Sequence, residues 1–296
     1  MTRIDRILCP IDFSEFSDKA FDYAQSLAWH YHATLYLQHV IDSLVPYYPY
    51  QAYPEAYEEM CRNLREGARN DLQEFAKKHS WRGVQPQCTV ADGEATDLIL
   101  GFAEAQGVNL IVMGTHGRRG IDHLTLGSVT EKVLRKAHCP VLAVRKPDHD
   151  FVIPAGDGDP DLVQLRRILY CTDFSDNSEL AFDPAVSLAA EYNAELTLLH
   201  VLEETAGEVD IEKVIAKVLE RLETRISPEA RQNGKVKAAV RIGQAYQQII
   251  QFALESQTDL IIMGVRGRKA LDLAVFGSTT YRVVQLGPCP VLVVHI

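Results

Sequence analysis

The feature that most constrains the fold of this chain is that its sequence repeats itself. Residues 7–14, Ile-Leu-Cys-Pro-Ile-Asp-Phe-Ser, return 161 positions later as Ile-Leu-Tyr-Cys-Thr-Asp-Phe-Ser. Further on, Met-Gly-x-x-Gly at 113–117 and Cys-Pro-Val-Leu at 139–142 return 150 positions later. A period of this length indicates two copies of one domain. The change of offset from 161 to 150 places one insertion in the first copy, between residues 41 and 90.

The length of the chain agrees with two domains, since 296 residues is about twice the usual domain size. The segment between the repeats, residues 146–165, holds three prolines, two glycines and five aspartates, a composition typical of a linker. We therefore predict a first domain at 1–146, a linker at 147–164 and a second domain at 165–296. Each half is large enough to bury its own core.

Within each half, short apolar runs alternate with segments that repeat apolar residues at helical spacing. Strict alternation of strands and helices predicts a doubly wound α/β fold, with a parallel sheet covered on both faces. Continuous apolar runs such as Leu260-Ile261-Ile262-Met263 suit strands that are buried on both sides. In the first half, strands are predicted at 6–11, 34–40, 84–90, 109–113 and 140–145, with helices at 16–31, 55–79, 95–106 and 128–137. The second half repeats the series from 166–171 to 290–295.

Composition excludes several classes of function. The formal net charge is −10, and no run of five basic residues occurs, which argues against a nucleic-acid-binding protein. No stretch approaches the roughly 18 apolar residues of a membrane span, and the first residues lack the pattern of a signal peptide. The six cysteines are scattered without any Cys-x-x-Cys pair, as expected for reduced thiols. We therefore expect a cytoplasmic protein.

A glycine-rich motif follows the fourth predicted strand of each half. Residues 114–128 and 264–278 both fit G-x2-G-x9-G-[ST], and a helix is predicted to begin at the final Gly-Ser. Glycines allow backbone N–H groups to approach a phosphate closely, and a helix N-terminus adds unpaired donors and a favourable dipole. Arg118 and Arg268 hold the same loop position and could add positive charge. The motif is neither a Walker A loop nor the dinucleotide-binding fingerprint.

The double motif resembles that of the ATP-binding universal stress proteins, and the resemblance covers nearly the whole chain, twice. It implies two tandem domains, each a five-stranded parallel sheet of order 3-2-1-4-5. Ligands of such sheets bind at the switch point beyond the carboxyl ends of the strands. It also implies that the last strands of the two halves pair within the chain as a pseudo-dimer. Their apolar edges would otherwise stay open. Further association into a homodimer is left open.

The resemblance assigns roles to particular residues. The acidic residue after the first strand, Asp12 or Asp173, would approach the ribose, the phosphates or their Mg²⁺ or Mn²⁺ ion. The residue near the end of the second strand, Val40 or Val201, would contact adenine through its backbone. The remaining implied nucleotide-binding residues are Pro10, Met113, Gly114, His116, Gly117, Arg118, Gly127, Ser128, Val129 and Thr130 in the first half, and Met263, Gly264, Gly267, Arg268, Gly277, Ser278, Thr279 and Thr280 in the second.

Three of the differences between the two halves lie next to the predicted ligand. Cys171 stands where the first half has Pro10, and the loop residues Thr115-His116 become Val265-Arg266. We therefore expect the two sites to differ in affinity, or only one of them to fill.

Structural explanations compete with these assignments. Ser128 to Glu131 also reads as a capping box, and Asp12 and Asp173 could cap the helix that follows them. His39 and His200 lie on apolar strands and are better explained as core histidines than as ligands. No spacing typical of a structural metal site occurs among the ten histidines. The tyrosine-rich insertion at 46–53 could be a lid over the first site, a partner surface or a packed irregular loop.

The function that follows is an ATP-binding module of stress response or signalling, in which the nucleotide acts as a regulatory ligand. A slow ATPase or self-phosphorylating protein is the alternative from a different class, although no catalytic base can be identified. A scaffold with empty sites is the third. The sequence names no protein partner.

Overall fold

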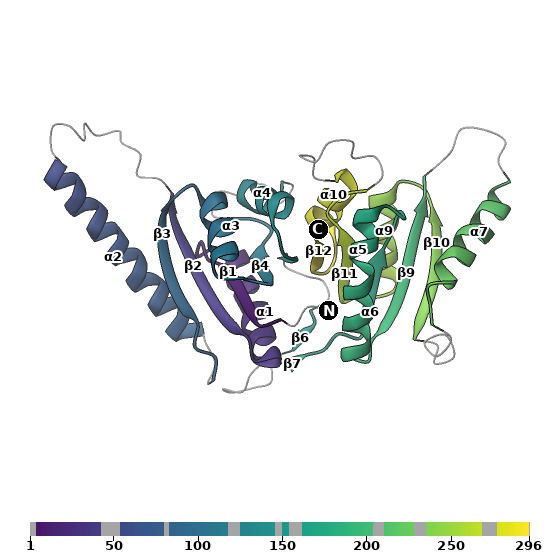
Figure 1. Cartoon of the computed structure of the whole chain (residues 1–296), viewed down its shortest axis with the longest axis horizontal. Coiled ribbons are helices and arrows are strands. Elements are labelled where there is room, and N and C mark those ends of the chain that lie inside the picture. The colour runs from purple at the N-terminus through teal and green to yellow at the C-terminus, as the bar shows by residue number, and fades with distance from the viewer. Residues whose placement is uncertain are drawn as a thin grey trace.

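In the computed structural model, the chain forms one ten-stranded sheet that carries helices on both faces (Figure 1). The structure describes residues 4–42, 54–79, 83–117, 125–145, 150–153, 162–203, 210–227, 235–267 and 277–295. The first half contains β1 (Arg6–Pro10), α1 (Glu15–Tyr31), β2 (Thr34–Asp42), α2 (Pro54–His79), β3 (Gln87–Gly93), α3 (Ala95–Ala105), β4 (Leu110–Gly114), α4 (Ser128–Lys136) and β5 (Val141–Val144). The second half contains β8 (Arg167–Cys171), α5 (Asp176–Leu180), α6 (Phe182–Glu191), β9 (Glu195–Leu202), α7 (Ile211–Glu223), β10 (Val236–Ile242), α9 (Ala245–Glu255), β11 (Leu260–Gly264), α10 (Ser278–Leu286) and β12 (Val291–Val294).

The strand order across the sheet is β10-β9-β8-β11-β12-β5-β4-β1-β2-β3. Each half thus has the predicted order 3-2-1-4-5 with parallel neighbours, so the predicted fold class is confirmed. The two halves join where β12 pairs antiparallel with β5, Leu292 opposite Leu142. Because the halves run in opposite directions, the carboxyl ends of their strands lie at opposite edges of the common sheet.

Two apolar cores lie on the two faces of the sheet, and each one spans both halves. One core contains residues of α1, α2, α6 and α7, such as Phe21 and Leu222. The other contains residues of α3, α4, α9 and α10, such as Ile99 and Val283. Both β4 and β11 are buried along their whole length, as expected for strands covered on both sides.

The second half departs from the first in the helix that follows its first strand. The first half has the single helix α1, whereas the second has α5 and α6 with a break at Ala181. Pro184 stands in the first turn of α6, at the position of Tyr23 in α1. Proline has no N–H to continue the ladder of a preceding helix, which accounts for the break. The insertion in the first half lies in the region of α2, which has 26 residues where α7 has 13.

The segment between the halves is packed against the first domain. Val152–Ile153 (β6) pairs antiparallel with Leu162–Val163 (β7). Phe151 is 2% exposed and meets Tyr23 of α1 edge to face. The Tyr23 hydroxyl donates to Asp150 Oδ1 at 2.5 Å, and Lys19 forms an ion pair with the same carboxylate. The composition of this segment predicts a linker, and it does not indicate that the segment is attached to α1.

Candidate functional site

A tight turn after the first strand fixes an aspartate in the same way in both halves. Asp12 Oδ1 accepts from the backbone N and the hydroxyl of Ser14, at 3.1 and 2.6 Å. Asp173 Oδ1 accepts from the same atoms of Ser175, at 3.0 and 2.6 Å. The serine, not the aspartate, is the N-cap of the helix that follows. The alternative that these aspartates cap the helix themselves is therefore wrong.

The residue between each aspartate and serine has a left-handed backbone. Phe13 has φ 61° and Phe174 has φ 59°, a conformation that costs energy in a bulky residue. Packing of the half-buried rings against the core offsets this cost. The Phe174 ring stacks on His200 with centroids 4.7 Å apart, and the Arg221 guanidinium lies 3.9 Å from its centroid on the other side. The turn therefore holds the carboxylate in one orientation.

The second carboxylate oxygen of each aspartate faces the glycine-rich loop. A Cβ at Gly117 would lie 2.6 Å from Asp12 Oδ2, and a Cβ at Gly267 would lie 2.6 Å from Asp173 Oδ2. Neither separation is compatible with a side chain in the present arrangement, because such contacts are below van der Waals distance. Gly264 is equally constrained, since a Cβ there would overlap the backbone oxygen of Asn177. The predicted glycine spacing thus brings the loop backbone against the aspartate.

The last glycine of the motif begins a helix that has no side-chain cap. Gly127 and Gly277 are the N-cap residues of α4 and α10, and neither helix has a side-chain hydrogen bond at its cap. Ser128 and Ser278 come next and are exposed. The capping-box explanation of Ser128 is therefore wrong. The first-turn N–H groups of such a helix lack intrahelical partners and attract an anion.

The threonines of the motif behave differently from the serines. The Thr130 hydroxyl is buried and donates to the Gly114 carbonyl at 2.8 Å, and the Thr280 hydroxyl donates to the Gly264 carbonyl at 3.0 Å. These bonds tie the first turn of the helix to the end of the preceding strand. The structure thus gives both side chains a structural role, whereas Ser128 and Ser278 are exposed residues.

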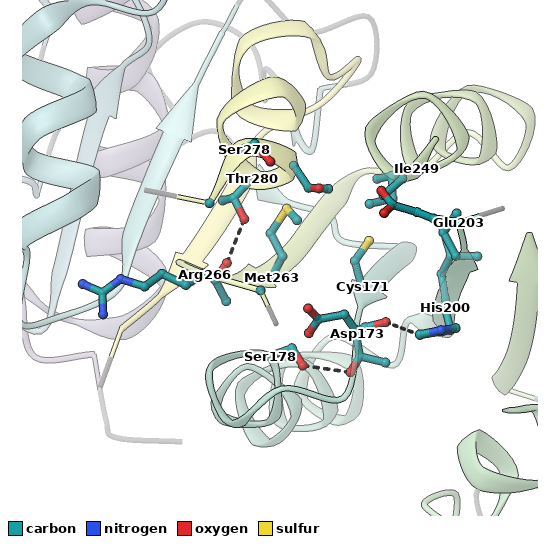
Figure 2. Close-up of a pocket in the computed structure, with 18 of the residues that line it drawn as sticks. Cys171, Asp173, Ser178, His200, Glu203, Ile249, Met263, Arg266, Ser278 and Thr280 are labelled. Carbon is teal, nitrogen blue, oxygen red and sulfur yellow. Dashed lines mark hydrogen bonds between the residues drawn. The ribbon is translucent and has the colours of Figure 1, made fainter. Parts of the chain in front are cut away.

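In the second half, these elements surround a cavity of about 450 Å³ at the carboxyl ends of the strands (Figure 2). Cavities that bind small molecules have volumes in this range. Ten residues were predicted for this half, of which Arg268 lies outside the described residues. The other nine line the cavity: Asp173, Val201, Met263, Gly264, Gly267, Gly277, Ser278, Thr279 and Thr280. Figure 2 shows Ser278 and Thr280 on one side, His200 and Glu203 on the other, and Asp173 and Met263 between them.

Comparison with protein families identifies the family to which the two halves belong. The model of the universal stress protein family matches residues 3–145 and again residues 164–295. The chain belongs to this family. Its two halves are therefore two universal stress protein domains in tandem.

Curated relatives match about half of this chain or nearly all of it. A universal stress protein of Methanocaldococcus jannaschii is 34% identical over 144 residues, which is 48% of this chain and 82% of the relative. A universal stress protein of Mycolicibacterium smegmatis is 28% identical over 303 residues, 98% of this chain and 96% of the relative. A solved universal stress protein from Archaeoglobus fulgidus superposes with a TM-score of 0.65 at 22% identity, covering 99% of this chain and 98% of that one. This last likeness concerns the fold alone.

Several residues of the cavity in this tandem universal stress protein were not predicted from its sequence. They come mainly from the end of β9 and the start of α9: Leu202, Glu203, Ala245 and Ile249. The sequence did contain a signal for the α9 residues. Gly93-Glu94-Ala95 and Ile99 return 150 positions later as Gly243-Gln244-Ala245 and Ile249, so this turn is part of the repeat.

The histidines on the second strand of each half are buried, as predicted. His39 Nδ1 lies 2.6 Å from the Ile11 carbonyl, and His200 Nδ1 lies 2.8 Å from the Thr172 carbonyl. These contacts join the second strand to the residue before the aspartate turn. His116 is also buried, with Nδ1 2.9 Å from the Thr115 hydroxyl and its ring packed on Phe16. A contact between His116 and phosphate stays a prediction.

The predicted residues that remain fall into two groups. Four of them lie on the first-half strands and helix where the sequence placed them: Pro10, Val40, Met113 and Val129. Met113 is buried in β4, and Val129 is half-buried in α4. Arg118, Arg268 and the tyrosine-rich segment 46–53 lie outside the described residues. Arg266, which replaces His116 in the second half, lines the cavity, but its guanidinium extends away from Asp173 (Figure 2).

Cys171 replaces Pro10 in the second half and contributes to the cavity wall. Its side chain is 5% exposed, and burial raises the pKa of its thiol. A buried thiol that stays protonated is a poor nucleophile. We therefore assign Cys171 to the shape of the cavity and to no chemistry.

The described residues give three further findings, on metal ions, on the membrane and on the cysteines. No group of three or more His, Cys, Asp or Glu side chains among them is placed to hold a metal ion. None of the described helices has the length and apolar character needed to cross a bilayer. All six cysteines are free.

Proposed function

We propose that this universal stress protein binds ATP with a divalent cation in the cavity of its second half, and that the bound nucleotide acts as a regulatory ligand. The observation that carries the proposal is the convergence of the glycine loop, the uncapped start of α10 and the Asp173 carboxylate on one cavity. The first half repeats the aspartate turn, the loop glycines and the uncapped helix, and we propose the same ligand there.

The residues present fit a triphosphate. Glycines at 264, 267 and 277 leave the loop backbone close to the cavity, where N–H groups can donate to phosphate oxygens. The first turn of α10 adds further donors and the positive end of the helix dipole. Asp173 Oδ2 faces the same loop, and a carboxylate oxygen is a ligand that Mg²⁺ and Mn²⁺ accept while phosphate oxygens and water supply the rest.

A regulatory role is favoured over rapid turnover because of what the cavity offers. Among the described residues that line it, Arg266 is the one arginine or lysine, and its guanidinium extends away from Asp173. Efficient phosphoryl transfer requires cations on the transferred group and a residue that orients the nucleophile. Slow hydrolysis and self-phosphorylation remain the alternative, and weak activity is the most that we expect. Free thiols and acidic composition support a cytoplasmic location, which we also propose.

The proposal is tested by denaturing the purified chain and by identifying and counting the nucleotide that it releases. We expect ATP at one to two molecules per chain, and a preparation stripped of nucleotide should bind Mg-ATP in a calorimetric titration. Release of ADP from protein loaded with ATP would favour the hydrolytic alternative. The proposal fails if nothing is released and titrated Mg-ATP does not bind.

A further inference from the structure

The cavity of the second half has two ends of different chemistry. One end consists of the loop glycines and the start of α10, where the free groups are N–H donors. The opposite end consists of Val201 and Leu202 from the end of β9 and Ala245 and Ile249 from α9. Figure 2 shows Ile249 and Glu203 together at this end, across the cavity from Ser278 and Thr280. Apolar side chains of this kind suit contact with the faces of a planar ring.

Among the described residues, two carboxylates line the cavity, one toward each end. Asp173 faces the loop, with Oδ2 directed at Gly267. Glu203 follows the last residue of β9, is exposed, and lines the apolar end. An ionised carboxylate accepts hydrogen bonds and donates none, and it repels a phosphate group. Glu203 is therefore suited to a neutral ligand group that donates hydrogen bonds, next to a ring held by apolar side chains.

We propose that Glu203 determines the specificity of the second site by accepting a hydrogen bond from the exocyclic amine of the purine. The inference rests on the proposed binding of ATP and adds to it a choice of base. A 6-amino purine has the required donor, whereas hypoxanthine has an oxygen at that position and would face the carboxylate with an acceptor. The first half carries Asp42 at the equivalent position, which is one methylene shorter.

The magnitude of the effect follows from the type of hydrogen bond. A bond to a charged acceptor contributes enough to change affinity by roughly tenfold to a hundredfold. Because Glu203 is exposed at the cavity rim, its replacement by alanine removes the acceptor without leaving a buried hole. The variant should therefore fold as the wild type does.

The test compares the affinities of ATP, inosine triphosphate and 2′-deoxy-ATP in calorimetric titrations with Mg²⁺. All chains carry Gly117→Ala, so that the second site is measured with the first one weakened. Glu195→Ala is the matched control, because Glu195 begins the strand that Glu203 follows, lies outside the cavity and forms an exposed ion pair with Lys237. We expect ATP to bind at least about tenfold more tightly than inosine triphosphate, and Glu203→Ala to remove most of this preference. Glu195→Ala should preserve it.

Three results would overturn the inference alone, and a fourth would overturn it together with the proposed function. Equal affinities for ATP and inosine triphosphate in the unmodified second site would show that the amine is not recognised. A preference that survives in Glu203→Ala would assign it to other groups. If Glu203→Ala changes instead the ratio between ATP and 2′-deoxy-ATP, the carboxylate contacts the ribose. Failure of all three nucleotides to bind would overturn the proposed function together with the inference, and is thereby distinct from the other results.

Discussion

Single residues of the site serve two functions at once, and the two carboxylate oxygens of Asp173 show this most clearly. Oδ1 closes the turn by accepting from Ser175, while Oδ2 faces the backbone of Gly267. Phe174 lies between Asp173 and Ser175 in the chain, and its left-handed backbone is held by the contacts of its ring with His200 and Arg221. The carboxylate is thus positioned before any ligand binds, which lowers the entropy cost of binding.

At this scale, we predict that replacing the two loop glycines that face the aspartates weakens nucleotide binding. In Gly117→Ala/Gly267→Ala, each new Cβ would lie 2.6 Å from a carboxylate oxygen, so the loop or the aspartate must move. The affinity for Mg-ATP, measured by calorimetry, should fall at least about tenfold, while the free energy of unfolding changes by less than about 1 kcal/mol. Gly101→Ala is the control, since a Cβ there would have no atom within 4 Å. Undiminished affinity in the double variant would contradict the role of the loop.

At the scale of elements, the site depends on the hydrogen bonds that attach each glycine-rich loop and the helix after it to the sheet. The motif places a helix start beside the end of the fourth strand, and the Thr280 hydroxyl joins them by donating to Gly264. The loop is also tied to the last strand, because the Val265 N–H donates to the Val294 carbonyl at 3.1 Å. The uncapped N-terminus of α10 is therefore held in place from two sides.

We predict that Thr280→Val lowers the free energy of unfolding by about 1–3 kcal/mol, because it leaves the buried Gly264 carbonyl without this donor. Thr130→Val should have a similar effect in the first half, where the bond is 2.8 Å. Urea denaturation measures both. Thr224→Val is the matched control, since its hydroxyl bond to Arg221 is exposed, and its effect should stay within about 0.5 kcal/mol. If the three variants are equally stable, the threonines do not hold the helix.

At the scale of the whole molecule, one sheet and two shared cores join the halves. Beyond the β5–β12 pairing, His295 at the end of the second half has Nε2 2.6 Å from the Leu134 carbonyl in α4 of the first half. His295 is half-buried, and the partial removal of its ring from water lowers the pKa of its imidazole, as do Arg266 and His138 nearby. The loop residue Arg266 thus lies close to the junction.

This histidine predicts a pH dependence of stability. Its pKa in the folded chain lies below the unfolded value of about 6.5, so the unfolded chain binds the proton more readily. The contribution to stability is complete above pH ~6.5 and is lost as the pH falls toward the folded pKa. Urea unfolding between pH 7.5 and 5 should show this loss, and His295→Gln should reduce the slope.

The control for the pH experiment is His32→Asn, which removes an exposed histidine and retains a residue that tolerates its left-handed backbone of φ 53°. Its stability should depend on pH as that of the wild type does. If the stability of His295→Gln depends on pH as that of the wild type does, the imidazole of His295 does not contribute to this dependence.

The sequence by itself determined the repeated architecture of this protein. Period and spacing identified two α/β domains, located most strands and helices to within a few residues, and placed the glycine loop between a strand and a helix. Such features follow from the periodicity of apolar residues and from the backbone conformations that glycine allows, and both can be read from the sequence alone. The start of β3 was predicted three residues too early, at 84 instead of Gln87, since apolar character alone does not define where pairing begins.

Only the tertiary structure decided which groups meet. It showed that Ser14 and Ser175 cap the helices while the aspartates face the loop, and that Thr130 and Thr280 are engaged in the core. It brought the end of β9 and the start of α9 to the apolar end of the cavity, which placed Glu203 there. Residues far apart in the chain become neighbours only through the order of the strands and the packing of the helices, and no local pattern records those contacts.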